Sequence, residues 1–288
     1  MSECIVITSG KGGVGKTTST ANLGVALALM GKKVAVVDAD IGLRNLDVIL
    51  GLENRIVYDL VHVIEGECKL RQALIKDKRV DGLYLLPAAQ TRDKNAVSPE
   101  NMRDLVKQMK EEFDYVLIDC PAGIEQGFKN SIAGADRAII VTTPEVSAIR
   151  DADRIIGLCE AAELPEPMLI VNRFRAKLVK RGDMLNKEDI LEILAIPLIG
   201  MVPDHEDVII TANRGYPAAF DEKSVVGEAY RRIARRITGE TDVPFVATEE
   251  PETMWGAVKR WMGFAPVQAG AKAQDGGKPQ DGLKEVAS

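Results

Sequence analysis

Short, almost wholly apolar runs rich in β-branched residues alternate along the chain with longer amphipathic stretches. The apolar runs predict strands at Cys4–Thr8, Val34–Asp38, Gly82–Leu86, Tyr115–Asp119, Ala138–Thr142, Met168–Asn172 and Leu198–Val202. Runs that are apolar at nearly every position are typical of parallel strands buried between two layers of helices. The amphipathic stretches predict helices near residues 16–30, 99–111, 147–161, 186–194 and 223–238. This alternation predicts an α/β fold with a doubly wound, mainly parallel sheet and helices on both faces.

The same pattern divides the chain into four parts. Residues 1–239 carry the predicted α/β domain, and residues 240–252, which are polar and include Pro244 and Pro251, predict a linker. Residues 253–264 predict a short amphipathic helix. Residues 265–288 contain no aromatic residue and are rich in Ala, Gly, Gln, Lys and Asp, so we expect a disordered tail.

Composition narrows the class of protein further. Apolar residues make up 46% of the chain and the net charge is −6, as in an ordinary cytosolic protein. The negative balance argues against a general nucleic-acid binder, and we expect no sequence-specific nucleic-acid partner. No 18-residue apolar run predicts a bilayer span, and we expect no signal peptide because a glycine-rich loop begins by Gly10. Four scattered cysteines without a CxxC pair favour buried core thiols in a reducing compartment over a zinc site: Cys4, Cys68, Cys120 and Cys159.

The glycine-rich loop fits the phosphate-binding pattern G-x-x-x-x-G-K-[ST] between a predicted strand and a predicted helix. It reads Gly10, Lys11, Gly12, Gly13, Val14, Gly15, Lys16 and Thr17. Its glycines let successive backbone N–H groups point at phosphate oxygens, and the following helix adds its positive N-terminal end. We expect Lys16 to reach the β- and γ-phosphates, Thr17 to bind Mg²⁺, and Thr18 to touch the α-phosphate. The loop therefore predicts a nucleotide site.

Carboxylates follow two of the predicted strands. Asp38 and Asp40 follow the strand that begins at Val34, and Asp119, the Walker B candidate, ends the strand that begins at Tyr115. An acidic residue at such a strand end near a phosphate loop holds Mg²⁺ or its water shell. We assign Asp38 and Asp119 to the metal and Asp40 to the attacking water. The alternative for each is a helix cap or a solvated loop charge.

Lys11, a second lysine inside the loop, is not needed to hold phosphate within one subunit, and it can reach a neighbouring subunit instead. The run Lys-Gly-Gly-Val-Gly-Lys-Thr resembles the deviant Walker A motif of the MinD/ParA family of ATPases. In that family the first lysine crosses a nucleotide-sandwich homodimer, which implies a catalytic role for Lys11 beside Lys16 and Asp40. The segment around Asn172 and Arg173 lacks the aspartate of a guanine-binding motif, so the base is expected to be adenine. The resemblance implies that Asn172, Arg173, Pro203 and Asp204 frame it.

The resemblance is strongest to the septum-site-determining members of the family and covers residues 3 to 264. It rests on the runs 38–47, 72–79, 86–93, 119–124, 144–151 and 181–185. It implies an Mg²⁺-dependent ATPase switch on the cytoplasmic face of the inner membrane that places the division septum. The implied partners are a MinC-like division inhibitor and a MinE-like activator, with Ser147 and Asp151 at the partner-binding positions. These two residues can equally be a helix N-cap and a solvated charge. The chain departs from the family pattern by continuing to Ser288.

Residues 253–264 describe an interfacial anchor when they are placed on a helix. One face would carry Met254, Trp255, Val258, Trp261, Met262 and Phe264, and the other would carry Lys259 and Arg260. About 11 residues reach roughly 16 Å, which is too short to span a bilayer. The basic face predicts binding to anionic membrane lipids. The alternative is a helix that packs on the domain.

Three other functions share parts of this pattern. A DNA-segregating ATPase of the ParA type should carry a basic face near its C-terminus rather than Trp255 and Trp261. A nitrogenase-like reductase needs more thiols near the switch than Cys120, because a four-thiolate cluster shared by two subunits takes two from each. A nucleotide-binding scaffold without enzymatic activity would give no multiple-turnover phosphate release.

Overall fold

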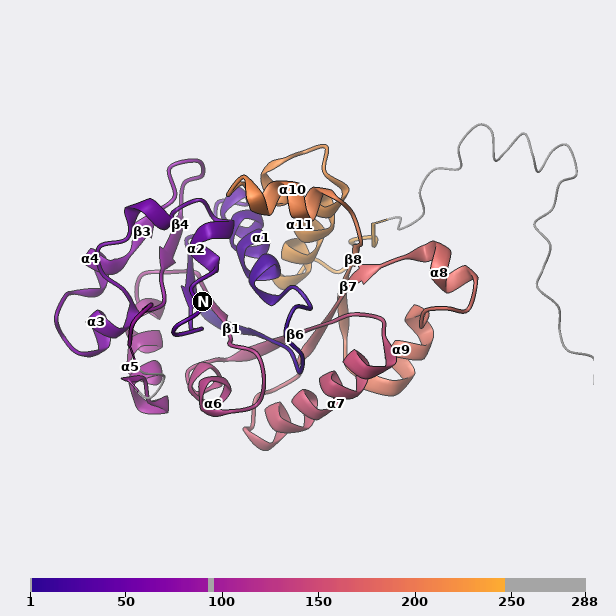
Figure 1. Ribbon diagram of the computed structural model, residues 1–288, viewed down its shortest axis with the longest axis horizontal. Coiled ribbons are helices and arrows are strands. Elements are labelled where there is room, and N and C mark those ends of the chain that lie inside the picture. The colour runs from indigo at the N-terminus through magenta and orange to yellow at the C-terminus, as the bar shows by residue number, and fades with distance from the viewer. Residues whose placement is uncertain (1, 93–95, 247–288) are drawn as a thin grey trace, which may run out of the picture. The chain divides into compact units, whose positions relative to one another are not determined.

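Residues 2–92 and 96–246 are described by the computed structural model, and within them eight strands form one sheet (Figure 1). The strand order is β3-β4-β2-β5-β1-β6-β7-β8. The strands are β1 (Glu3–Thr8), β2 (Val34–Asp38), β3 (Ile75–Lys76), β4 (Leu83–Leu86), β5 (Tyr115–Asp119), β6 (Arg137–Thr142), β7 (Met168–Phe174) and β8 (Leu198–Pro203). All paired neighbours are parallel except β3, which runs antiparallel to β4. The predicted fold class and all seven predicted strands are confirmed.

Helices cover both faces of this sheet. The five predicted helices are α1 (Lys16–Leu29), α5 (Pro99–Lys110), α7 (Val146–Ala161), α9 (Lys187–Leu194) and α11 (Val225–Ile237). Short elements that the pattern did not predict are α2 (Leu46–Ile49), α3 (Leu60–Ile64), α4 (Leu70–Ala73), α6 (Gln126–Ile132), α8 (Ala176–Lys180), α10 (Asp207–Asn213) and the 3₁₀ turns Glu53–Arg55 and Ala218–Phe220. None of the helices within the described ranges has the length and apolar character needed to cross a membrane.

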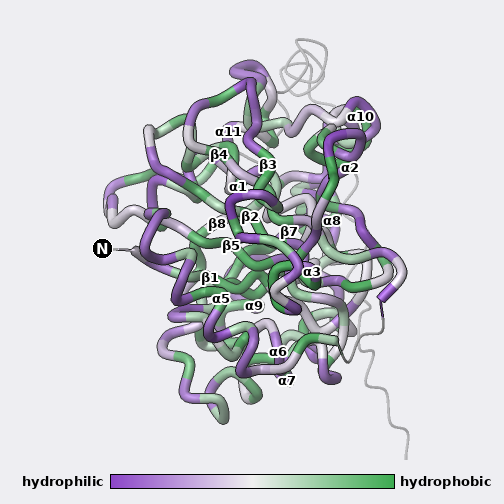
Figure 2. Tube along the Cα trace, turned by 90° about the vertical axis from the view of Figure 1, so that its left-hand side faces the viewer, coloured by the Kyte–Doolittle hydropathy of each residue, from purple (hydrophilic) through white to green (hydrophobic). Residues whose placement is uncertain are grey.

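Alternation along each strand divides the core into two apolar layers. On β1, Ile5 and Ile7 face the layer that contains α1 and α11, whereas Cys4 and Val6 face the layer that contains α5, α7 and α9. Figure 2 shows the apolar strands in the interior and polar chain at the outer turns. Burial of large apolar side chains on both faces explains why the strands read as continuous apolar runs.

Local signals set the ends of the longer helices. Ser98 caps α5 and forms a reciprocal capping box with Asn101, and Pro99 occupies the first turn. Asn186 caps α9 in the same way, and the Ser224 hydroxyl accepts a hydrogen bond from the Gly227 backbone N–H of α11. Each cap satisfies backbone donors that the first helical turn leaves without partners.

Helix α11 lies close to both the sheet and the helix that follows the phosphate loop. A side chain at Gly200 on β8 would place its Cβ 2.2 Å from Ile233 Cγ1, so the absence of one permits this close approach. On the other side, the Tyr230 hydroxyl lies 3.0 Å from the Ser19 hydroxyl of α1, and both residues are buried. Helix α11 is therefore in direct contact with α1.

The chain beyond α11 stays on the domain through residue 246. Val243 is buried, and Phe245 and Val246 are partly buried against the apolar core. The predicted linker of residues 240–252 thus begins with residues that contact the domain. The rest of that linker, the predicted helix of 253–264 and the predicted tail of 265–288 lie outside the described residues.

Candidate nucleotide site

The phosphate loop connects β1 to α1 at the centre of the sheet. Gly13 and Gly15 have φ angles of 76° and 102°, in the left-handed region that glycine tolerates. A Cβ at Gly15 would also lie 2.3 Å from the Asn172 amide nitrogen. Two separate constraints therefore require glycine at position 15, and the loop can curl its N–H groups toward a phosphate as predicted.

Lys16 is the buried cation of the loop. Its Nζ lies 3.0 Å from the Ser9 hydroxyl, and that hydroxyl donates a 2.8 Å hydrogen bond to the Lys11 carbonyl. Only 8% of Lys16 is exposed, whereas Lys11 is an exposed residue. The two lysines of the motif thus differ in position, because Lys16 points into the site and Lys11 lies at the surface. Ser9 was not among the predicted site residues because it precedes the motif.

Two carboxylates meet beside this loop. Strands β2 and β5 pair in parallel so that Asp38 lies opposite Asp119, and both are almost fully buried. Burial and then the charge of Asp38 raise the pKa of Asp119 to about 8, while Thr17 and Lys16 lower it to a smaller extent. Burial also raises the pKa of Asp38 to about 6. A divalent cation fits this donor set, because it would favour the ionised form of both carboxylates.

Thr17 and Thr20 bring hydroxyl groups to the same place. A hydrogen bond from the side chain of Thr17 is one of the influences that lower the pKa of Asp119. Thr20, one helical turn later, lies with its Oγ1 3.3 Å from Asp119 Oδ1. Oxygen donors of this kind suit Mg²⁺. The sequence analysis did not select Thr20, although its spacing of three residues from Thr17 places both on one helix face.

Asp38 also organises the loop that follows β2. Its carboxylate accepts hydrogen bonds from the backbone N–H groups of Asp40 (3.0 Å), Asn45 (3.3 Å) and Leu46 (3.2 Å). The N-cap of α2 is Asn45, so Asp38 is not the cap residue, although its carboxylate accepts a hydrogen bond from the N–H of Leu46, the first residue of that helix. The loop carrying Asp40 is therefore built on the same carboxylate that faces Asp119.

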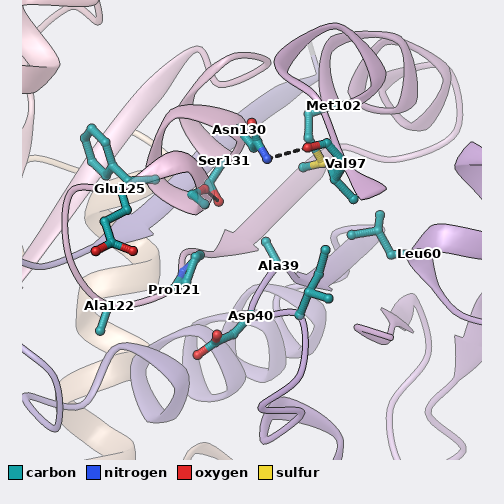
Figure 3. A pocket seen from close by; sticks show the side chains of 13 residues that line it. Ala39, Asp40, Leu60, Val97, Met102, Pro121, Ala122, Glu125, Asn130 and Ser131 are labelled. Carbon is teal, nitrogen blue, oxygen red and sulfur yellow. Dashed lines mark hydrogen bonds between the residues drawn. The ribbon is translucent and has the colours of Figure 1, made fainter. Parts of the chain in front are cut away.

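Asp40 lies at the edge of a small cavity between the loops that follow β2 and β5 (Figure 3). The cavity has a volume of about 50 Å³. Among its lining residues are Ala39, Asp40, Pro121, Ala122 and Glu125. Asp40 is half-buried, so its carboxylate keeps some access to solvent. This position is compatible with a role in orienting water.

Arg79 holds the other end of α2 from a distant part of the chain. Its guanidinium forms a bidentate pair with the buried carboxylate of Asp77 and donates to the carbonyls of Leu50 and Gly215. Leu50 follows α2, and Gly215 follows α10. Arg79 therefore connects the end of α2, which follows the Asp38 loop, to the end of α10, which follows β8. Neither contact has a signal in the local pattern.

The residues predicted to frame adenine gather where β7 and β8 end. The Asn172 amide donates a 2.8 Å hydrogen bond to the Val14 carbonyl, so this side chain supports the phosphate loop. Arg173 is exposed with a left-handed φ of 54°. Pro203 pairs with the end of β7, and Asp204 forms an ion pair with Arg175. The structure brings these residues to the strand ends beside the loop, and their contact with a base stays a prediction.

Helix α7 lies against the phosphate loop. A Cβ at Gly10 would lie 2.3 Å from the backbone oxygen of Asp151, so the loop and the helix touch. The N-cap of α7 is Glu145, and therefore the alternative interpretation of Ser147 as the N-cap is wrong. Ser147 is exposed and Asp151 is half-buried. Partner binding by these two residues stays a prediction.

The predicted membrane residues cannot be placed relative to this site. They fall outside the described ranges and are Met254, Trp255, Val258, Lys259, Arg260, Trp261, Met262 and Phe264.

Comparisons with known proteins agree with this geometry. The AAA-domain family profile matches residues 2–164. The septum site-determining protein MinD of Bacillus subtilis is 59% identical over 265 residues, which cover 91% of this chain and 99% of that protein. The MinC:MinD cell division protein complex of Aquifex aeolicus contains a chain with a TM-score of 0.78 and 51% identity, covering 83% of this chain and 97% of that one. MinD of Pyrococcus horikoshii complexed with Mg-ADP has a TM-score of 0.76 and 30% identity, with coverage of 83% and 97%.

Proposed function

The chain belongs to the MinD family of cell-division ATPases that determine the septum site, and we propose that it acts as a Mg²⁺-dependent, membrane-associated switch. In this proposal ATP brings two copies together, and the dimer binds the cytoplasmic face of the inner membrane. The membrane-bound dimer recruits a MinC-like division inhibitor, and a MinE-like activator stimulates hydrolysis. The relative from Aquifex aeolicus, solved as a MinC:MinD complex, supports the inhibitor as a partner.

The surface around the phosphate loop supports dimerisation. Three large apolar residues are exposed on loops or helix starts that follow parallel strands: Leu43 after β2, Ile124 after β5 and Val146 after β6. Their exposed fractions are 61%, 42% and 57%. The carboxyl ends of parallel strands lie at one edge of a sheet, the edge that also carries exposed Lys11. A second copy placed against this edge would cover the apolar residues and receive Lys11.

The observation that carries the enzymatic part is the cluster of buried Lys16, Asp38 and Asp119 with half-buried Thr17 beside the phosphate loop. Bound Mg²⁺ would neutralise charge on the β- and γ-phosphates. Lys16 would bind the same oxygens, and Asp40 would orient the attacking water from the neighbouring loop. Lys11 of the second copy would stabilise the charge that develops on the transferred phosphate, as an arginine finger does.

Membrane attachment is assigned to residues 253–264. A single short helix binds lipid weakly because ordering it costs free energy, but two helices on one dimer bind much more strongly. Dimerisation by ATP would thereby control how long the protein stays on the membrane. The basic residues Lys259 and Arg260 would favour anionic lipid.

A DNA-binding role of the ParA type is less well supported. Helix α11 carries Arg231, Arg232, Arg235 and Arg236, which could form a basic face. In the structure these side chains have partners within the domain. They donate hydrogen bonds to backbone carbonyls or pair with Glu228 and Glu240. The high identity to MinD proteins points the same way.

Co-sedimentation with anionic liposomes in ATP, ADP or no nucleotide tests the proposal. Wild-type protein should sediment with ATP far more than with ADP, and Trp261→Glu should abolish this while leaving the melting temperature unchanged. A Trp261→Glu protein that melts several degrees lower but still sediments would show that the helix packs on the domain. Multiple-turnover phosphate release with lipid would separate an enzyme from a binding scaffold.

A further inference from the structure

Residues 243–246, here called the C-terminal strap, are fastened to the domain rather than merely adjacent to it. The strap consists of Val243, Pro244, Phe245 and Val246 and follows α11 in the chain. Val243 is only 7% exposed. Phe245 and Val246 pack against opposite layers of the apolar core. The strap is thus the last part of the chain that the structure describes, and it is held by side chains of the domain.

Two arginines of α11 donate hydrogen bonds to backbone carbonyls of the strap, and we call this set of contacts the grip. Arg236 donates to the carbonyl of Val243 at 2.6 Å and to the carbonyl of Ile199 on β8 at 2.8 Å. Arg232 donates to the carbonyls of Pro244 at 3.1 Å and Phe245 at 2.9 Å. Three successive strap carbonyls therefore accept hydrogen bonds from charged donors, which are stronger than those from neutral donors.

The Phe245 ring completes the grip. The Arg236 guanidinium lies 4.2 Å from the ring centroid, and Lys187 Nζ of α9 lies 5.0 Å from it. Cations within about 6 Å of an aromatic face are attracted to it. Glu228 holds Arg232 in place through a 2.7 Å hydrogen bond. The grip therefore involves α9, α11 and β8 together.

We propose that this grip sets the length of the tether between the ATPase domain and its membrane helix, and thereby the strength of two-helix binding by the dimer. The inference rests on the proposed membrane function of residues 253–264. With the strap held, six residues, 247–252, separate it from the predicted helix in the sequence, and a chain of that length spans at most about 20 Å. With the strap released, the tether begins after Glu240, whose backbone N–H still donates to the Arg235 carbonyl, and its twelve residues, 241–252, span up to about 40 Å.

The longer tether lowers the effective concentration of the second helix at the membrane. For a flexible chain this concentration falls roughly as the 3/2 power of tether length, so lengthening from six to twelve residues lowers it about threefold. Single-helix binding by the monomer does not depend on this term. Release of the strap should thus weaken membrane binding by the ATP-bound dimer about threefold and leave binding by the ADP-bound monomer unchanged.

The chain offers a matched control on the same helix. Arg235 belongs to α11 like Arg232 and Arg236, but it pairs with Glu240 at the surface. None of the described hydrogen bonds of Arg235 goes to the strap. Arg235→Ala removes an arginine from α11 without releasing residues 243–246, so it corrects for the loss of positive charge near an anionic membrane.

The test titrates vesicles of phosphatidylglycerol and phosphatidylethanolamine against full-length protein in ATP and in ADP. Phe245→Ala and Arg232→Ala each leave the bond from Arg236 to Val243, so each should require up to about threefold more lipid for half-maximal sedimentation in ATP, with no change in ADP. Arg235→Ala should bind like the wild type. Basal ATP hydrolysis and melting temperature are measured on each variant, so that loss of folding is recognised.

A second variant keeps the grip intact and lengthens the tether directly. Six Gly/Ser residues inserted after Val246 give a tether of twelve residues and should cause the full loss of about threefold. Phe245→Ala combined with the insertion should lose less than the two changes multiplied together, because part of the lengthening has already occurred. If the wild type binds in ATP and the insertion has no effect, the tether inference is wrong. If the wild type does not bind vesicles in ATP, the proposed membrane function itself fails.

Discussion

Paired burial of Asp38 and Asp119 predicts that the isolated domain loses stability as the pH rises. The Asp119 carboxyl releases its proton near pH 4 in the unfolded chain, but burial raises its pKa to about 8 in the folded domain. Between these values the folded state holds about one more proton than the unfolded state. Its free energy of unfolding therefore falls by about 1.4 kcal/mol per pH unit. Below pH 6 the slope is steeper, because the pKa of Asp38 is also raised, to about 6.

Urea unfolding at pH 5, 6, 7 and 8, without nucleotide and with a chelator, measures this slope. Asp119→Asn should remove most of the decline between pH 6 and 8, because the amide has no proton to lose. Asp104→Asn, on the exposed side of α5, should leave the slope unchanged. Added Mg²⁺ should flatten the wild-type profile by stabilising the ionised pair. Stability that is constant or rises from pH 6 to 8 would refute the reasoning, because Asp119 would then be ionised in the folded domain at pH 6.

Four substitutions test the assigned roles one at a time. Lys16→Ala should abolish tight ATP binding in calorimetry, because it removes the buried cation aimed at the phosphates; wild-type affinity would contradict the assignment. Asp40→Ala should bind ATP and accumulate as a dimer in gel filtration but release phosphate slowly; unchanged turnover with lipid and activator would exclude its water-positioning role. Asn172→Ala should weaken ATP binding about tenfold, because the Val14 carbonyl loses a hydrogen bond worth roughly 1–1.5 kcal/mol; calorimetry that shows no change would mean the loop needs no such support. Asp151→Ala should weaken pull-down of the MinC-like partner while sparing basal hydrolysis; loss of ATP binding instead would show that the Asp151 side chain supports the nucleotide-binding fold.

The strands were predictable because their physical signal is local. A strand buried on both faces reads as an apolar run, and β1, β2 and β5 need no other information. Strand β3 has two residues, Ile75 and Lys76, which are too few to show a period. Helix α6 was missed for a related reason, since its seven residues include Gly127, Lys129 and Asn130 and show no apolar stripe.

The chemistry of the site was predictable from the sequence, but the contacts between its residues were not. The phosphate loop and the strand-end carboxylates follow from motif and position, yet the pairing of Asp38 with Asp119 requires knowing that β2 lies beside β5. Asn172 was selected for the base, and its bond to Val14, 158 residues away, is visible only in the fold. Arg79 likewise bonds to a carbonyl 136 residues away. Contacts between side chains and distant carbonyls leave no period in the sequence.

The strap shows the opposite limit of sequence analysis. Polar composition and two prolines are typical of a linker, and they predicted one for residues 240–252. The grip of Arg232 and Arg236 on strap carbonyls depends on backbone atoms, which every residue has. Composition therefore could not distinguish a fastened segment from a free one.

The two edge strands of the sheet, β3 and β8, affect how copies of this protein associate when they are crowded. At one end β3 offers only two residues for pairing with another chain. At the other end β8 is flanked by Pro197 and terminated by Pro203, and Arg236 occupies the carbonyl of Ile199. Short edges, prolines and charged side chains all oppose the addition of a foreign strand. On the membrane surface proposed for this protein, copies would meet often, and these protected edges would favour reversible helix and loop contacts over β-aggregation.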